Sequence, residues 1–192
     1  RNHPSFKEFK NKFLRDQSLK KLQKYSKSFG ISLFATPGDF ESLERICKIK
    51  MPAIKISSGL LTNLPLIMEA SKKNVPIILS TGMSYFKEIL DAVNISKKYQ
   101  NKIIILKCTS IYPAPAETLN LKGIATLKKR FNIPIGYSDH CLGIDSAVNA
   151  VALGATIIEK HFTLNKSLKG ADHKISLEPT EFKEMVKKRR LI

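Results

Sequence analysis

The feature that most constrains the fold of this 192-residue chain is a regular alternation of short apolar runs with segments of helical length. The runs are rich in β-branched residues, as β-strands usually are. They lie at residues 31–34, 53–56, 75–79, 103–106, 133–135 and 156–158. Six consecutive βα units predict an α/β protein with a parallel sheet, because parallel neighbours need a crossover of a dozen or more residues, usually a helix.

The first 29 residues form a charged segment with a helical pattern. Its apolar residues recur on one stripe, and Gly30 follows as a candidate C-cap; these residues are Phe6, Phe9, Phe13 and Leu14. We predict a helical N-terminal segment over residues 1–29. Residues 30–192 are expected to form one partial TIM-barrel synthase domain, since no linker or low-complexity segment interrupts them.

Four later helices have recognisable first residues. Asp, Asn and Ser favour the N-cap because their side-chain oxygen accepts a backbone N–H that the helix leaves unpaired. We therefore predict helices over residues 40–49, 64–73, 85–99 and 147–153, which follow Asp39, Asn63, Ser84 and Asp145-Ser146.

Polar residues gather just past the predicted strands, at residues 36–37, 55–59, 80–82, 108–110, 137–140 and 159–163. In a (β/α)8 barrel of the TIM type the active site lies at this carboxyl face. A doubly wound open sheet is the alternative, but it usually carries a glycine-rich phosphate-binding turn, which the sequence lacks. We predict an incomplete TIM barrel. About six βα units are found where eight close a barrel, so either two strands escape detection or the chain is incomplete.

The composition excludes several classes of protein. Lys and Arg total 33 against 16 Asp and Glu, a net charge of +17, but the lysines are scattered over predicted helices without interleaved aromatic residues, so we predict no nucleic-acid partner. No apolar stretch approaches the roughly 20 residues of a membrane span, so we predict no membrane partner. The three cysteines, Cys47, Cys108 and Cys141, suggest neither a disulfide framework nor a structural zinc site, and a cytoplasmic location fits best.

Two polar clusters each follow an apolar run and each contain one histidine. They are Gly136-Tyr137-Ser138-Asp139-His140 and Glu159-Lys160-His161-Phe162-Thr163. Because side chains alternate along a strand, Ser138 and His140 share one face, and Glu159 and His161 share another. Two imidazoles at neighbouring strand ends form an incomplete metal site that leaves positions for water and substrate. The pattern therefore predicts a metal or anion site at the mouth of the barrel.

One lysine and three hydroxyl groups also lie at the ends of separate strands: Lys55, Thr36, Ser80 and Ser138. Together they supply the fixed positive charge and the donors that a multiply charged anion needs. The alternative for each residue is a helix cap or a solvent-exposed lysine.

Seven motifs in this order resemble the N-acetylneuraminate (sialic acid) synthase family. They are Ala35-Thr36-Pro37, Lys55-Ile56-Ser57-Ser58-Gly59, Leu79-Ser80-Thr81-Gly82-Met83, Tyr112-Pro113-Ala114-Pro115, the two clusters above and Gly170-Ala171-Asp172-His173. The resemblance runs from about Gly30 to Arg190. It implies a metal-dependent transferase of carbohydrate biosynthesis that condenses phosphoenolpyruvate with an N-acetylated hexose, such as N-acetylmannosamine, to give a nonulosonic acid and phosphate.

Carried over residue by residue, the resemblance makes His140 and His161 ligands of a divalent metal, Mn²⁺ or Mg²⁺. Phosphoenolpyruvate contacts are expected from Thr36, Lys55, Ser80, Ser110 and Ser138, and the catalytic, sugar-facing residues are expected to be Glu159, Tyr112 and Asp172. Ser110 stands where the family often has asparagine, Leu60 where several members carry an acidic residue, and Cys141 where a small hydroxyl residue is usual. The first two departures leave the acceptor sugar open.

Several alternatives stay open. Glu159 has a second possible role as a salt-bridge partner of a lysine such as Lys107, and for His173 a structural role is favoured. The alternative hypotheses for the function are a legionaminic or pseudaminic acid synthase, a spore-coat polysaccharide biosynthesis protein, and a truncated remnant that binds sugar without turnover.

The resemblance also implies features outside this chain. The family's first two barrel strands have no counterpart before Ile31, and its antifreeze-like domain would follow Ile192. We therefore expect a fragment that is inactive and poorly soluble by itself, from a full-length protein that forms a homodimer.

Overall fold

In the computed structural model, which describes residues 14–100 and 102–190, five strands form one parallel sheet in the order β1-β2-β3-β4-β5. The strands are β1 (Ile54–Ile56), β2 (Ile77–Ser80), β3 (Ile103–Cys108), β4 (Ile135–Asp139) and β5 (Ile158–Lys160). Strands that are consecutive in sequence are therefore neighbours in the sheet. This is the order of a barrel wall and excludes the doubly wound alternative, in which the strand order reverses.

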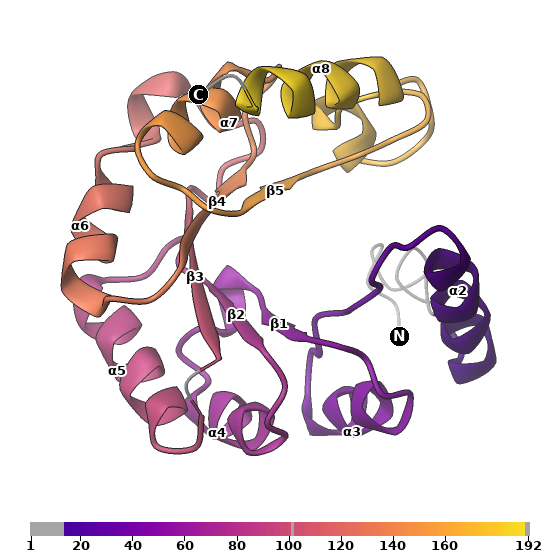
Figure 1. Ribbon diagram of the computed structural model, residues 1–192, viewed down its shortest axis with the longest axis vertical. Helices are drawn as coiled ribbons and strands as arrows, with labels where there is room; N and C mark the ends of the chain where they lie inside the picture. Colours follow the sequence, from indigo (N-terminus) through magenta and orange to yellow (C-terminus); the bar gives the residue numbers. More distant parts are fainter. Residues whose placement is uncertain (1–13, 101, 191–192) are drawn as a thin grey trace, which may run out of the picture.

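Helices connect successive strands and lie along the outside of the sheet. Figure 1 shows an open arc with the strands on its inner side and α2 and α8 at its two ends. The helices are α2 (Asp16–Ser28), α3 (Phe40–Lys48), α4 (Leu64–Lys72), α5 (Phe86–Lys97), α6 (Gly123–Phe131), α7 (Asp145–Ala152) and α8 (Pro179–Arg189), with short 3₁₀ turns η1 (Ser58–Leu60), η2 (Ala116–Thr118) and η3 (Asp172–Ile175). Along the described ranges, no helix is long and apolar enough to cross a membrane.

The first predicted strand, over residues 31–34, is wrong. The chain there makes one isolated parallel bridge, between Ala35 and Ile54 at the edge of β1. Ile31 is 62% exposed and Phe34 is 39% exposed, so this run lacks the packing that holds the inner strands. The predicted N-terminal helix is present as α2, and Gly30 follows it with a positive φ of 69°. Its predicted first turns, with Phe6, Phe9 and Phe13, lie outside the described residues.

Two of the four predicted helix starts are confirmed. The Asp39 carboxylate accepts the Ser42 N–H at 2.7 Å, and the Asn63 side chain accepts the Leu66 N–H at 3.2 Å. The other two are wrong: Tyr85 is the N-cap of α5, and Ile144 is the N-cap of α7. The Glu88 side chain accepts the Tyr85 N–H at 2.6 Å, and this hydrogen bond helps to cap the first turn of α5.

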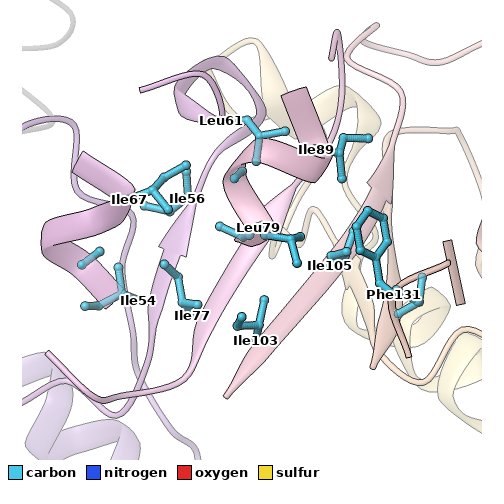
Figure 2. Close-up of a cluster of buried hydrophobic side chains, with 14 of the residues drawn as sticks. Ile54, Ile56, Leu61, Ile67, Ile77, Leu79, Ile89, Ile103, Ile105 and Phe131 are labelled. Atoms are coloured by element: carbon cyan, nitrogen blue, oxygen red, sulfur yellow. The ribbon is translucent and has the colours of Figure 1, made fainter. Parts of the chain in front are cut away.

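Alternation along the strands divides the apolar side chains into two layers. Residues on the outer face pack against the surrounding helices, and Figure 2 shows this cluster, which includes Ile54, Ile56, Ile77, Leu79, Ile103 and Ile105. A smaller cluster on the inner face contains Ala53, Ile78 and Leu106 with Ile104 and Ile157. The same alternation turns the polar residues that follow these inner positions toward the concave side of the arc.

The open sheet has a consequence for the isolated chain. Among the described residues, β5 pairs only with β4, and β1 has β2 and the single Ala35 bridge. Because an unpaired strand edge is a template for pairing with another chain, we expect the isolated 192-residue chain to self-associate at micromolar concentration. Light scattering measures this directly, and a monodisperse monomer that melts cooperatively would contradict the expectation.

Candidate active site

A cavity of about 500 Å³ lies at the carboxyl ends of the strands on the concave side of the sheet. It is lined by Thr36, Lys55, Ser57, Ser58, Gly59, Ser80, Met83, Cys108, Ser110, Tyr112, Ser138, His140, Glu159, Lys160 and His161. All the predicted site residues except Asp172 are in this set. Residues that are up to 125 positions apart, from Thr36 to His161, therefore meet in one cavity because parallel strands place their carboxyl ends together.

The strand boundaries differ from the prediction in a way that bears on this site. Lys55, Ser80 and Ser138 lie within β1, β2 and β4, not in the loops that follow. Their backbones are held by the ladder on both sides, for example through the Lys55↔Ile78 and Ser138↔Glu159 register. A side chain on a strand is positioned more rigidly than one on a loop, so the polar groups of the cavity form a fixed set.

A continuous chain of polar contacts crosses the cavity from β1 to β4. The Lys55 ammonium lies 3.4 Å from one Glu159 carboxylate oxygen, and the Ser138 hydroxyl donates to the other at 2.6 Å. Ser138 Oγ in turn lies 3.5 Å from His140 Nε2. The Ser138 hydroxyl therefore lies between the Glu159 carboxylate, to which it donates, and the His140 ring.

The His140 ring is held in one orientation by its surroundings. Nδ1 donates to the Thr109 carbonyl at 2.6 Å, and Tyr112 stacks on the ring with 4.0 Å between centroids. Burial lowers the pKa of His140, but hydrogen bonds to Cys108 and Thr109 outweigh it, so the pKa is raised overall. Because Nδ1 donates to Thr109, Nε2 is the nitrogen that would bind a metal, and metal binding would displace the proton that the raised pKa favours there.

His161 lies beside His140, with 5.5 Å between the ring centroids. Burial lowers its pKa, so the neutral form, which can bind a metal, is favoured. Asp172, in η3, has a carboxylate oxygen 3.9 Å from His161 Nδ1. Asp172 therefore stands at the rim of the cavity, next to the second imidazole, and its side chain is 66% exposed.

The donor set fits an open divalent-metal site. Across residues 14–100 and 102–190, no group of three or more His, Cys, Asp or Glu side chains is arranged to hold a metal ion. The two imidazoles would supply two ligands and leave the remaining positions to water or substrate. The metal site therefore stays a prediction, with these two imidazoles as its proposed ligands.

The hydroxyl group of Ser80 is the clearest sign of a missing ligand in the cavity. Its Oγ is buried and has no hydrogen-bond partner. A buried polar group without a partner costs about 1 to 3 kcal/mol, so such groups usually receive a partner from a ligand or water. Ser80 lines the same cavity as Lys55, which places an unsatisfied donor near a fixed positive charge.

Two alternatives from the sequence are now settled. The alternative salt bridge of Glu159 to a lysine is present, but its partner is not Lys107, which lies on the opposite face of β3 from the cavity and whose ammonium donates to the Cys108 carbonyl at 3.2 Å. Glu159 pairs with Lys55 instead. The structural role favoured for His173 is supported: its Nδ1 lies 2.7 Å from Thr163 Oγ1 and outside the cavity.

Sequence reasoning missed several residues that line the cavity, among them Ser57, Ser58 and Cys108. Ser58 Oγ accepts the Gly82 N–H at 3.0 Å, which leaves its own proton free to donate. Gly82 is required there, since a Cβ at this position would lie 2.1 Å from Ser110 Oγ. The signal was the Lys55-Ile56-Ser57-Ser58-Gly59 motif, in which only Lys55 was given a role.

A buried ion pair supports the site from the outer face of the sheet. Lys160, between Glu159 and His161, lies 2.8 Å from Asp139, between Ser138 and His140, and the two side chains are 1% and 0% exposed. Asp139 also accepts the Ser146 hydroxyl and the Cys141 N–H. The pair joins the ends of β4 and β5, which carry the two imidazoles.

Comparison with known proteins gives a consistent result along the whole chain. The NeuB family model matches residues 1–192. The chain is 48% identical over 185 residues to the uncharacterized protein MJ1065 of Methanocaldococcus jannaschii, with 96% of this chain and 55% of that protein covered. It is 46% identical over 168 residues to the N,N'-diacetyllegionaminic acid synthase of Campylobacter jejuni, with 85% and 50% covered. The chain thus spans about half the length of these relatives.

A solved structure has the same fold. The N-acetylneuraminic acid (sialic acid) synthetase of Leptospira borgpetersenii, determined in complex with citrate, superposes with a TM-score of 0.91 at 38% identity. The match covers 93% of this chain and 62% of that one. The open parallel sheet with outer helices is therefore an incomplete (β/α) barrel, as predicted.

Proposed function

Since the chain belongs to the NeuB family, we propose that it provides the reaction site of a synthase that condenses phosphoenolpyruvate with an N-acetylated hexose. The products are a nonulosonic acid and inorganic phosphate, and the reaction consumes one water. The observation that carries the proposal is a single cavity that combines an anion pocket, Lys55 with the unsatisfied Ser80 hydroxyl, and an open pair of imidazoles.

Phosphoenolpyruvate would occupy the side of the cavity formed by β1 and β2. Lys55 supplies the charge, and the hydroxyl groups of Thr36, Ser58, Ser80 and Ser110 supply donors. Ser138, which donates to Glu159 at 2.6 Å, would bind the anion by turning its hydroxyl proton toward it. Donors fixed on strands need little reorganisation when the anion enters, which is the condition for electrostatic stabilisation of charge that develops in the reaction.

His140 and His161 would hold a Mn²⁺ or Mg²⁺ ion on the other side of the cavity. Lewis-acid polarisation of the aldehyde of the open-chain sugar is the chemistry that such an ion would supply. Tyr112, which contacts both imidazole rings, would shield this part of the cavity from solvent and face the sugar.

Glu159 is the group best placed to move a proton. It lies between the Lys55 ammonium and the Ser138 hydroxyl, one alternation from His161 along β5. We assign it the proton transfer that accompanies addition to the aldehyde or the later attack of water. Asp172, at the exposed rim, would bind a sugar hydroxyl group.

The acceptor sugar is the finer part of the proposal. The legionaminic acid synthase from Campylobacter and the sialic acid synthetase from Leptospira suggest two possible acceptor sugars. Ser110 and Leu60, where this chain departs from the family, leave the choice between them open. We propose that the complete protein is a cytoplasmic homodimer, in keeping with the free thiols of Cys47, Cys108 and Cys141. The rival is a remnant that binds sugar without turnover.

Phosphate release by the complete protein tests the proposal. With Mn²⁺ and phosphoenolpyruvate present, release should depend on the sugar added, and N-acetylmannosamine should be compared with the 2,4-diacetamido hexose that corresponds to a legionaminic acid synthase. No release after addition of either sugar, together with tight binding of phosphoenolpyruvate, would favour the remnant. Release without any sugar would contradict a condensation.

Replacement of Lys55 by methionine is expected to weaken phosphoenolpyruvate binding by about 10- to 150-fold. The change keeps the apolar stem of the side chain but removes charge-assisted hydrogen bonds worth about 1.5 to 3 kcal/mol. Isothermal titration of phosphoenolpyruvate measures the effect. Lys129→Met, at an exposed position of α6, is the matched control and should bind normally. Normal affinity in Lys55→Met would remove this lysine from the anion pocket.

A further inference from the structure

A second cavity, of about 710 Å³, lies on the other face of β3, between the N-terminal parts of α5 and α6. It shares only the Met83, Cys108 and Ser110 positions with the candidate active site. Its remaining walls come from residues that the proposed reaction does not use.

Lys107 is the central cation of this cavity. It is partly buried, and its ammonium has one hydrogen-bond partner, the Cys108 carbonyl at 3.2 Å. Within the part of the chain that the structure describes, it makes no ion pair. Burial lowers the pKa of Lys107, which reports the cost of keeping this charge away from water. An ammonium group has three donors, so two remain for a ligand.

The lining of the cavity around Lys107 is positive, and among the described residues it holds no counter-charge. None of the side chains lining the cavity is acidic, and Lys122 adds a second cation. The Lys107 stem packs at the start of α6, where a Cβ on Gly123 would lie 3.3 Å from Lys107 Cε. The N-cap of α6, Lys122, makes no side-chain capping bond. A partly desolvated cation beside the positive end of a helix is an unfavourable arrangement, and a bound anion would relieve it.

The rest of the cavity is suited to the uncharged part of a small molecule. Phe86, Ile89 and Leu127 provide an apolar wall, and the exposed ring of Tyr85 stands at its edge. Hydroxyl and amide groups of Ser84, Asn120 and Thr126 lie around it. A mainly apolar surface with a few polar groups and one charge is the usual character of a site for a small organic ligand.

We propose that this cavity is a second binding site, which takes a small organic oxyanion with its phosphate or carboxylate at Lys107 and its apolar or aromatic part against Phe86 and Leu127. The site is distinct from that of the proposed condensation, because neither Lys55 nor the two imidazoles line it; of the proposed phosphoenolpyruvate contacts only Ser110 lies in both cavities. Its occupant would lie next to the active site, with Cys108 and Ser110 in the common wall.

Titration of the complete protein with phenyl phosphate, followed by isothermal calorimetry, tests the proposal. The titration is made in the Lys55→Met background, so that the proposed phosphoenolpyruvate pocket competes less for the phosphate. Binding is expected there, and Lys107→Met added to that background should weaken it by about tenfold or more, because a charge-assisted contact is lost. Lys129→Met, on α6 but outside the cavity, is the matched control and should leave binding unchanged.

Binding of two simpler ligands and of one further variant tests whether the charged and the apolar parts of the cavity both contribute. Inorganic phosphate should bind more weakly than phenyl phosphate, and phenol should not bind, if the charged and apolar parts of the cavity act together. Lys122→Met, an exposed change with little risk to folding, should weaken binding about two- to threefold through its longer-range charge. Loss of binding in Lys55→Met alone, equal binding in Lys107→Met and its control, or no binding of phenyl phosphate at millimolar concentration would each overturn the proposal.

Discussion

Replacement of both His140 and His161 by alanine is expected to abolish metal-dependent turnover of the complete protein, a fall of more than about 100-fold. The expectation follows from the two imidazoles, which lie side by side in the cavity with 5.5 Å between ring centroids. Even residues that only orient a metal ligand change metal affinity or activity by about 10- to 100-fold. Protein treated with a chelator should regain phosphate release on addition of Mn²⁺, and the double variant should not.

Three comparisons make this result specific. His173→Asn is the control histidine change, since His173 bonds to Thr163 outside the cavity, and it should keep the response to Mn²⁺. The binding of Mn²⁺, measured by electron paramagnetic resonance, should be lost in the double variant without the need for turnover. Phosphoenolpyruvate affinity should fall less than in Lys55→Met, because the Lys55 side of the cavity is intact. Unchanged turnover in the double variant would remove the metal from the mechanism.

The sequence predicts the parts of this site that depend on periodicity. The 2-residue repeat of a strand places Ser138 and His140 on one face and Glu159 and His161 on one face, and both pairs line the cavity as expected. The alternation of apolar runs and helix-length segments predicts the parallel order of β1 to β5. These features are local, so a single sequence contains them.

The parts that the sequence does not predict depend on which residues lie opposite each other. The β4–β5 register pairs Ser138 with Glu159 and Asp139 with Lys160, and from this register come both the Ser138–Glu159 hydrogen bond and the buried ion pair. Nothing in the sequence distinguishes Lys55 from Lys107 as the partner of Glu159, although they face opposite sides of the sheet. The run at residues 31–34 has the composition of a strand but lies at the sheet edge. There, pairing with neighbouring strands determines whether a strand forms.

The ion pair beneath the site leads to the largest expected effect on stability. Replacement of Lys160 by methionine is expected to lower the free energy of unfolding by about 3 to 5 kcal/mol, because it leaves the buried Asp139 carboxylate without its counter-charge. The Lys160 ammonium also donates to the Cys141 carbonyl at 2.5 Å, and this contact is lost as well. Urea unfolding measures the change as a shift of the midpoint at constant slope.

Two further variants show whether the loss of stability in Lys160→Met comes from the unpaired Asp139 charge or from the removal of any lysine. Lys87→Met breaks the exposed Lys87–Asp91 pair and should leave the midpoint unchanged, since water and salt screen that pair. Adding Asp139→Asn to Lys160→Met removes the uncompensated charge but keeps the hydrogen-bonding shape of the side chain, so the double variant should be more stable than the sum of the two single changes predicts. If Lys160→Met unfolds at the same urea concentration as Lys87→Met, the Asp139–Lys160 pair is not buried in solution, and the junction between β4 and β5 beneath the two imidazoles is looser than the structure describes.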